Sequence, residues 1–151
     1  LNTSAGPEDP AKVGRYRLLA KIFGVTGVGP LRSQVEPIMF GTTFLADPTT
    51  KRRRDEWAAQ VSAAKRSGMK KAIYGVTDRE PIADELDRII TPTLVVAGAE
   101  DVATPVPLAQ TIAASIGGAH LEVLTECGHT STVERPELVG ELIESFIDKH
   151  R

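Results

Sequence analysis

A short apolar run that ends at a glycine and leads straight into an acidic loop constrains this chain most strongly. The run is Leu94–Ala97, followed by Gly98 and Asp101 within TPTLVVAGAEDVATP. Consecutive apolar residues with β-branched members are typical of a parallel strand that is covered on both faces. Because open α/β sheets bind ligands beyond the carboxyl ends of their strands, Asp101 is predicted to lie at a functional edge. The competing role, capping the next helix, is assigned to Thr104, which precedes a proline in a favourable N-cap pair.

A second strand and a second candidate residue follow. The sequence HLEVL (His120–Leu124) predicts a strand, and apolar spacing predicts a helix over Pro105–Ile116 before it. Strand, helix and strand form the βαβ unit of a parallel sheet, so both strands end at one edge. There Asp101 and His129 are expected within about 2.6–3.2 Å of each other. The carboxylate would then fix the imidazole tautomer and leave the other ring nitrogen as a general base.

The first half of the sequence is predicted to be helical. Apolar residues recur every three or four positions over Ala11–Phe23, and we expect a helix there. A second clear helix is expected over Thr50–Arg66 and is predicted to end at Gly68. Its Trp57 either anchors the helix to the core, the preferred role, or lines a substrate pocket. Further helices are expected over Leu31–Met39, Met69–Tyr74, Ile82–Leu86 and, at the end of the chain, Pro136–Lys149.

Composition and charge argue against several classes of function. The net charge of −2 gives no general attraction to nucleic acid or to anionic membranes, and the basic run Lys51–Arg54 is interpreted as a solvated helix turn. The glycine-rich segment Gly24–Pro30 lacks the Gly-Lys-Ser/Thr ending of a phosphate loop. A single cysteine excludes an internal disulfide. No apolar run reaches the roughly 18 residues of a membrane span, and no signal peptide is visible. We therefore expect a soluble, cytoplasmic protein without a metal or cofactor.

Three stretches together resemble a known family. PTLVVAGAEDVATP, GHTSTVERPE and the terminal amphipathic helix resemble the carboxyl-terminal portion of α/β-hydrolase-fold proteins, particularly enol-lactonases, esterases and haloperoxidase-like proteins. The resemblance covers residues 89–151 and implies that Asp101 is the triad acid and His129 the triad base. It also implies that residues 8–88 are a helical cap and residues 1–7 the end of a core strand and turn. The implied fold is a partial α/β-hydrolase fold, and the implied substrate is a small carboxylic ester or lactone.

The sequence departs from that family in one respect. The family places its serine on a G-x-S-x-G elbow ahead of the acid, and this chain has no such elbow. Ser115 lies between the acid and the histidine, and Cys127 lies only two residues before His129, so neither is predicted to be the nucleophile. The nucleophile is therefore expected in a missing amino-terminal half. That half, or a second copy of the chain, is the expected partner. The alternative is a non-catalytic hydrolase-like module that pairs with another chain.

Overall fold

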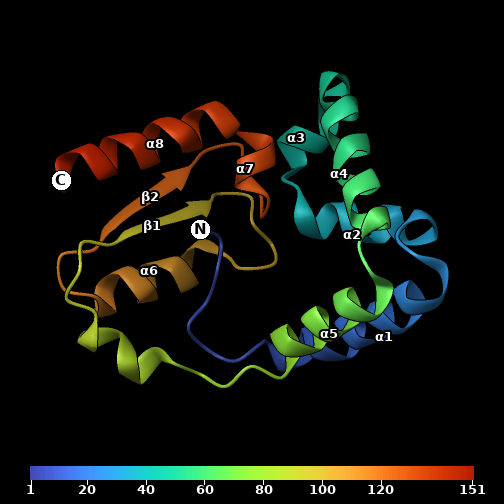
Figure 1. Cartoon of the computed structure of the whole chain (residues 1–151), viewed down its shortest axis with the longest axis horizontal. Helices are drawn as coiled ribbons and strands as arrows, with labels where there is room; N and C mark the ends of the chain where they lie inside the picture. The colour runs from blue at the N-terminus through green and yellow to red at the C-terminus, as the bar shows by residue number, and fades with distance from the viewer.

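A two-stranded parallel sheet forms the centre of the carboxyl-terminal part of the molecule. The computed structural model describes residues 1–151, and its strands are β1 (Leu94–Gly98) and β2 (His120–Leu124) (Figure 1). Gly98 lies opposite Leu124 in the parallel register, so both strands end at the same edge. Helix α6 (Val106–Ser115) connects them. The βαβ unit predicted from the sequence is therefore confirmed.

The two faces of this sheet are covered by different helices. Helix α6 lies on one face and α8 (Pro136–Lys149) on the other (Figure 1). Val95 packs with residues of α6, whereas its neighbour Val96 packs with Val139 of α8. Alternate side chains of a strand point to opposite faces, and both faces of β1 are buried. This double coverage is the reason that β1 appears in the sequence as an unbroken apolar run.

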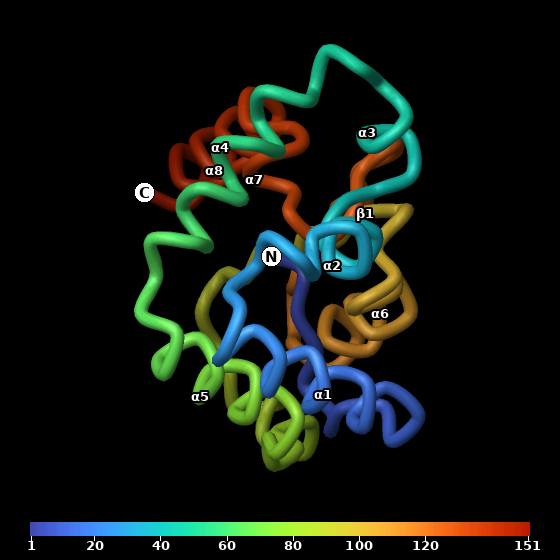
Figure 2. The backbone as a smooth tube through the Cα atoms, turned by 90° about the vertical axis from the view of Figure 1, so that its right-hand side faces the viewer, coloured from blue at the N-terminus to red at the C-terminus, as the bar shows by residue number.

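Residues before β1 form a separate helical layer, which we define as residues 10–88. The chain runs through it without a strand. Helices α1 and α5 lie side by side in both views (Figures 1 and 2). The layer has an apolar core of its own, centred on Leu19, Phe23, Val28 and Leu31. Its α-helices are α1 (Pro10–Thr26), α2 (Arg32–Met39), α3 (Thr42–Ala46), α4 (Lys51–Ala63) and α5 (Arg66–Thr77), and its 3-10 helices are Gly29–Leu31, Pro48–Thr50 and Ala83–Arg88.

The helix predicted over Ile82–Leu86 is a 3-10 helix, Ala83–Arg88, and the boundary near Gly68 differs most from the prediction. Gly68 does not end a helix but lies within α5, and the break falls at Ala64, whose backbone is extended. An isolated glycine costs a helix only about 1 kcal/mol, so the packing of α5 against α1 outweighs it. Trp57 packs edge-on against Phe40, with ring centroids 5.1 Å apart, as the anchoring role requires.

The amino-terminal segment also differs in detail. Residues 1–7 form no strand, but the Asn2 N–H donates to the Val96 carbonyl of β1 at 2.8 Å. This single bond places the start of the chain beside the carboxyl end of β1 (Figure 1). Two short helices, α3 and α7 (Ser131–Glu134), were not predicted, because four or five residues are too few to show a periodic pattern. No helix combines the length and apolar character that crossing a membrane requires.

Candidate active site

The loop after β1 holds Asp101 through its own backbone. The Asp101 side chain is fully buried. Its Oδ1 accepts the N–H groups of Ala103 (2.9 Å) and Thr104 (2.8 Å), and its Oδ2 accepts the Thr104 hydroxyl (2.8 Å). A carboxylate that accepts several such bonds is fixed in orientation and stays ionised.

Thr104 has a different role from the predicted one. Helix α6 begins after Pro105 and has no side-chain cap, so Thr104 is not its N-cap. Both polar groups of Thr104 instead donate to Asp101. The prediction that Thr104 caps the helix, and that Asp101 is therefore not needed as a cap, is wrong. The predicted position of Asp101 beyond β1 is right.

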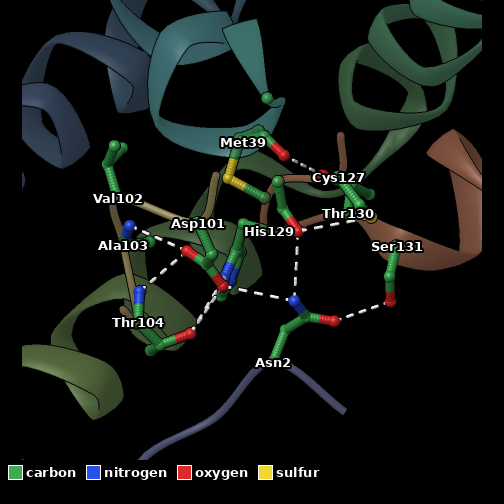
Figure 3. A network of polar contacts seen from close by, with 12 residues as sticks. Asn2, Met39, Asp101, Val102, Ala103, Thr104, Cys127, His129, Thr130 and Ser131 are labelled. Atoms are coloured by element: carbon green, nitrogen blue, oxygen red, sulfur yellow. Dashed lines mark hydrogen bonds and ion pairs between the residues drawn. The ribbon is translucent and has the colours of Figure 1, made fainter. Parts of the chain in front are cut away.

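The loop after β2 brings His129 to Asp101. The His129 Nδ1 lies 2.9 Å from Asp101 Oδ2, within the predicted range (Figure 3). An ionised carboxylate can only accept, so Nδ1 carries the proton. Thr104 Oγ1 lies 3.3 Å from the same nitrogen. Both hydrogen-bond contacts of the ring are made by Nδ1, and 24% of the side chain is exposed. Nε2 is therefore available to a reacting group.

The electrostatics of Asp101 favour its charged form. Burial alone would raise the pKa of Asp101, but the hydrogen bonds from His129 and Thr104 outweigh burial and hold this pKa below its usual range. An ionised partner at Nδ1 stabilises an imidazolium, the form that a general base adopts when it takes a proton.

Asn2 joins both loops and was not foreseen. Its side-chain amide donates to Asp101 Oδ2 (3.2 Å) and to the Gly128 carbonyl (3.1 Å), while its oxygen accepts the Ser131 hydroxyl (2.6 Å) (Figure 3). Its φ of 46° lies in the left-handed region, which Asn tolerates better than most residues. The only early sequence signal was an asparagine in a turn-rich segment, which does not indicate a partner 99 positions away.

The His129 loop also packs unusually close to its neighbours. A Cβ added at Gly98 would lie 2.2 Å from the Gly128 carbonyl oxygen, and a Cβ added at Gly128 would lie 2.2 Å from the Gly41 nitrogen. Side chains larger than hydrogen cannot occupy these positions without moving the backbone. The end of β1, the His129 loop and the turn before α3 are thus in direct backbone contact.

The helical layer reaches the Asp101 loop through polar contacts. From α1, the Lys12 ammonium donates to the carbonyls of Val102 (2.8 Å) and Ala103 (3.2 Å), next to Asp101. From the start of α3, the Thr43 N–H donates to the Glu100 carboxylate at 2.8 Å. These contacts connect the helical layer directly to the Asp101 loop.

Comparison with known proteins assigns the fold. A family model described as "Alpha/beta hydrolase family" matches residues 4–142. The chain belongs to the alpha/beta hydrolase family. The resemblance noted in the sequence is confirmed, and the fold is a partial α/β-hydrolase fold with its carboxyl-terminal parallel strands and flanking helices.

Relatives of this α/β-hydrolase chain are considerably longer than it is. Monoacylglycerol lipase ABHD6 of Mus musculus is 35% identical over 75 residues, which make up 50% of this chain and 22% of that protein. A hydrolase from Pseudomonas aeruginosa is 29% identical, with a TM-score of 0.78 over 97% of this chain and 53% of that one. An esterase from Thermogutta terrifontis, 23% identical, has a TM-score of 0.85 over 99% of this chain and 55% of that one. The chain thus spans about half the length of the solved structures it matches.

Neither of the two rejected residues of this α/β hydrolase has the environment of a nucleophile. Cys127 is fully buried, and burial raises the pKa of its thiol to about 12, so the reactive thiolate does not form near neutral pH. Ser115 lies in the last turn of α6 and donates to the Thr111 carbonyl. Because α6 runs back from the carboxyl edge of the sheet, its last turn lies at the edge opposite to Asp101. Neither environment favours a nucleophile.

A hollow between α2 and α4 lies away from this site and does not form a second one. It has a volume of about 470 Å³ and contains neither Asp101 nor His129. Its cations are paired: Arg32 contacts Glu36 and Asp55, and Arg54 contacts Glu36. No group of three or more His, Cys, Asp or Glu side chains is placed to hold a metal ion.

Proposed function

We propose that this chain is the carboxyl-terminal portion of a serine-dependent hydrolase of a small carboxylic ester or lactone. Asp101 is its triad acid and His129 its general base, and an amino-terminal half contributes the serine and the oxyanion hole. The contact between Asp101 Oδ2 and His129 Nδ1 at 2.9 Å is the observation that supports this most directly, since it leaves Nε2 of a partly exposed ring without a hydrogen bond. An esterase and a lipase among the relatives support the ester class.

The chemistry follows from the protonation state of His129. Nε2 takes the proton of the serine hydroxyl as the serine oxygen attacks the carbonyl carbon, and Asp101 stabilises the resulting imidazolium. The imidazolium then returns this proton to the departing alkoxide, which leaves an acyl-serine. Water, deprotonated by the same nitrogen, then attacks the acyl carbon. The bond to the serine oxygen breaks, the imidazolium returns the proton to that oxygen, and the carboxylic acid departs, which restores the free enzyme. In this proposal residues 8–88 are the cap that selects the substrate.

The free edge of β1 supports pairing with another chain segment. The sheet order is β1-β2, and on its other side β1 receives only the bond from Asn2. An uncovered parallel edge favours pairing with a further strand, from the amino-terminal half or from a second copy. Sedimentation should therefore detect association. A compact monomer that melts cooperatively would contradict this part of the proposal.

Labelling with a fluorophosphonate tests the catalytic assignment. The 151-residue chain alone should neither react with the probe nor hydrolyse p-nitrophenyl esters above background, because it has no activated serine. The complete enzyme should do both. Stoichiometric labelling of the chain alone would show that one of its own serines is the nucleophile. A complete protein that remains inert would favour a non-catalytic module.

A further inference from the structure

Glu134 is a second buried carboxylate, and the proposed reaction does not use it directly. The residue is only 3% exposed. Its Oε2 accepts the N–H groups of Gly41 (2.9 Å) and Gly128 (2.9 Å), and its Oε1 accepts the Thr130 N–H (3.1 Å). No lysine, arginine or histidine nitrogen pairs with this carboxylate. Burying an unpaired charge is costly, so its three hydrogen bonds have to compensate for desolvation.

Two of the three donors lie on either side of His129. Gly128 precedes the histidine and Thr130 follows it, so one carboxylate holds the peptide N–H groups of both neighbours. Fixing the backbone on both sides fixes the direction in which the His129 ring leaves the chain. That direction matters, because a hydrogen bond to Asp101 loses strength steeply when its geometry is disturbed.

The third donor belongs to the helical layer. Gly41 lies in the turn between α2 and α3, and its N–H meets the same Oε2 atom as Gly128. Two residues earlier, the Met39 carbonyl accepts both the N–H (2.9 Å) and the hydroxyl of Thr130. The turn Met39–Gly41 is therefore bound to the His129 loop at two points, and Glu134 bridges one of them.

We propose that Glu134 is a positioning residue that aligns His129 with Asp101 and couples this alignment to the Met39–Gly41 turn of the helical layer. A displacement of that turn, such as a substrate under the helical layer would cause, is transmitted to the histidine through one shared carboxylate oxygen. The proposal rests on the proposed function, because alignment matters only if His129 is the base.

Glutamine at this position distinguishes the two oxygens. A glutamine has one acceptor oxygen and one NH2 group, and the NH2 group cannot accept a hydrogen bond from a backbone N–H. The oxygen is therefore expected to stay with Gly41 and Gly128, which share Oε2, and the amide nitrogen to face Thr130. E134Q should weaken the Thr130 side of His129, where the N–H then keeps only the Met39 carbonyl, and leave the Gly41 contact in place. The matched control is E141Q, on the exposed surface of α8, which makes the same change of charge.

Nuclear magnetic resonance on the intact chain, in whatever assembly it forms, provides the test without any catalytic turnover. In the wild type, the amide protons of Gly41, Gly128 and Thr130 should exchange slowly, and the His129 Nδ1–H should give a resolved downfield signal. In E134Q, the Thr130 N–H keeps only the Met39 carbonyl as its acceptor, so Thr130 should exchange faster by about 10-fold or less, and the His129 signal should shift or disappear. E141Q should match the wild type.

Three results would overturn the proposal. One is a folded E134Q with an unmoved His129 Nδ1–H signal, which would leave Glu134 a purely structural role. Another is exposed-type exchange at any of the three amides in the wild type, which requires no variant to fold. If E134Q does not fold, E134D keeps the charge on a shorter side chain that cannot reach both segments. An unchanged His129 signal in folded E134D would be equally decisive.

Kinetics in the complete enzyme separate this proposal from the proposed function. E134Q should lower kcat and leave KM nearly unchanged, because the base is misaligned while the binding surface stays in place. A complete enzyme without any esterase activity would refute the proposed function and leave the His129 signals of E134Q to decide the alignment. An active enzyme in which E134Q changes KM alone would refute the alignment.

Discussion

Asp101 and Glu134 are both buried carboxylates within the same few loops, yet their surroundings differ in kind. Asp101 faces an imidazole, a hydroxyl and a side-chain amide in addition to backbone N–H groups. Glu134 accepts only backbone N–H groups. The pKa of Asp101 is lowered because the bonds from His129 and Thr104 outweigh burial, whereas burial raises the pKa of Glu134 against the bonds from Gly41, Gly128 and Thr130.

The difference shows how one residue type serves chemistry at one position and architecture at another. A carboxylate that contacts a titratable ring can stabilise the positive charge that the ring takes up during a reaction. A carboxylate surrounded by peptide N–H groups can only hold segments together. Burial by itself therefore does not identify a catalytic acid, and the nature of the partners does.

The largest effect is expected from D101N in the complete enzyme. Oδ1 faces two backbone N–H groups, so the asparagine oxygen should occupy that position and its NH2 group should face His129. The ring then has to accept at Nδ1, and the proton moves to Nε2, where a base is needed. Turnover should fall by about 10⁴-fold with the fold intact. The control is D148N, on the exposed surface of α8, and unchanged turnover in D101N would remove Asp101 from the triad.

Replacing Glu134 by alanine should affect stability most. E134A leaves the buried N–H groups of Gly41 and Gly128 without an acceptor, while the Thr130 N–H keeps the Met39 carbonyl. The expected loss is about 3 kcal/mol or more in the free energy of unfolding. Urea unfolding of E134A beside E141A measures it. A loss below about 1 kcal/mol would mean that water replaces the carboxylate. It would contradict the view that Glu134, unlike Asp101, serves to hold chain segments together.

A smaller effect is expected from T104V. The change keeps the shape of the side chain and removes the hydroxyl that donates to Asp101 Oδ2. Hydrogen bonds to a charged group contribute about 1.5–3 kcal/mol, and the loss should appear in stability with a parallel reduction in turnover. T111V, which removes a solvent-exposed hydroxyl from α6, is the control. Equal stability of the two variants would show that Asp101 does not depend on Thr104.

Asp101 and Glu134 should change the stability of the protein with pH in opposite directions. This is the smallest of the expected effects. The folded pKa of Asp101 lies below its unfolded value of about 3.9, so its contribution is present above that pH and is lost as the pH falls through the folded value. The folded pKa of Glu134 lies above its unfolded value of about 4.3, so stability falls as pH rises between the two. D101N should flatten the first slope and E134Q the second in urea titrations. Slopes that both variants leave unchanged would contradict these assignments.

Local patterns were sufficient for the sheet and the pair of residues at its edge. The apolar run before Asp101 and the strand before His129 each fix a position by sequence alone, and parallel pairing brings the two positions together. The hydrogen-bond partners that hold these two loops in place were not predictable in the same way. Asn2 lies 99 positions from Asp101, and Gly41 lies 93 positions from Glu134, so no local pattern connects them. Gly68 failed as a helix stop because tertiary packing decided that boundary.

The two ends of the chain differ in what can be attached to them. Leu1 precedes the residue that touches both Asp101 and the His129 loop, while Arg151 lies at the far end of α8, away from the tips of the strands (Figure 1). An affinity tag, fluorophore or surface tether joined at Leu1 would therefore sit next to the site. The same attachment at Arg151 leaves the site open, so a label or tether on these 151 residues is better placed after α8 than before Asn2.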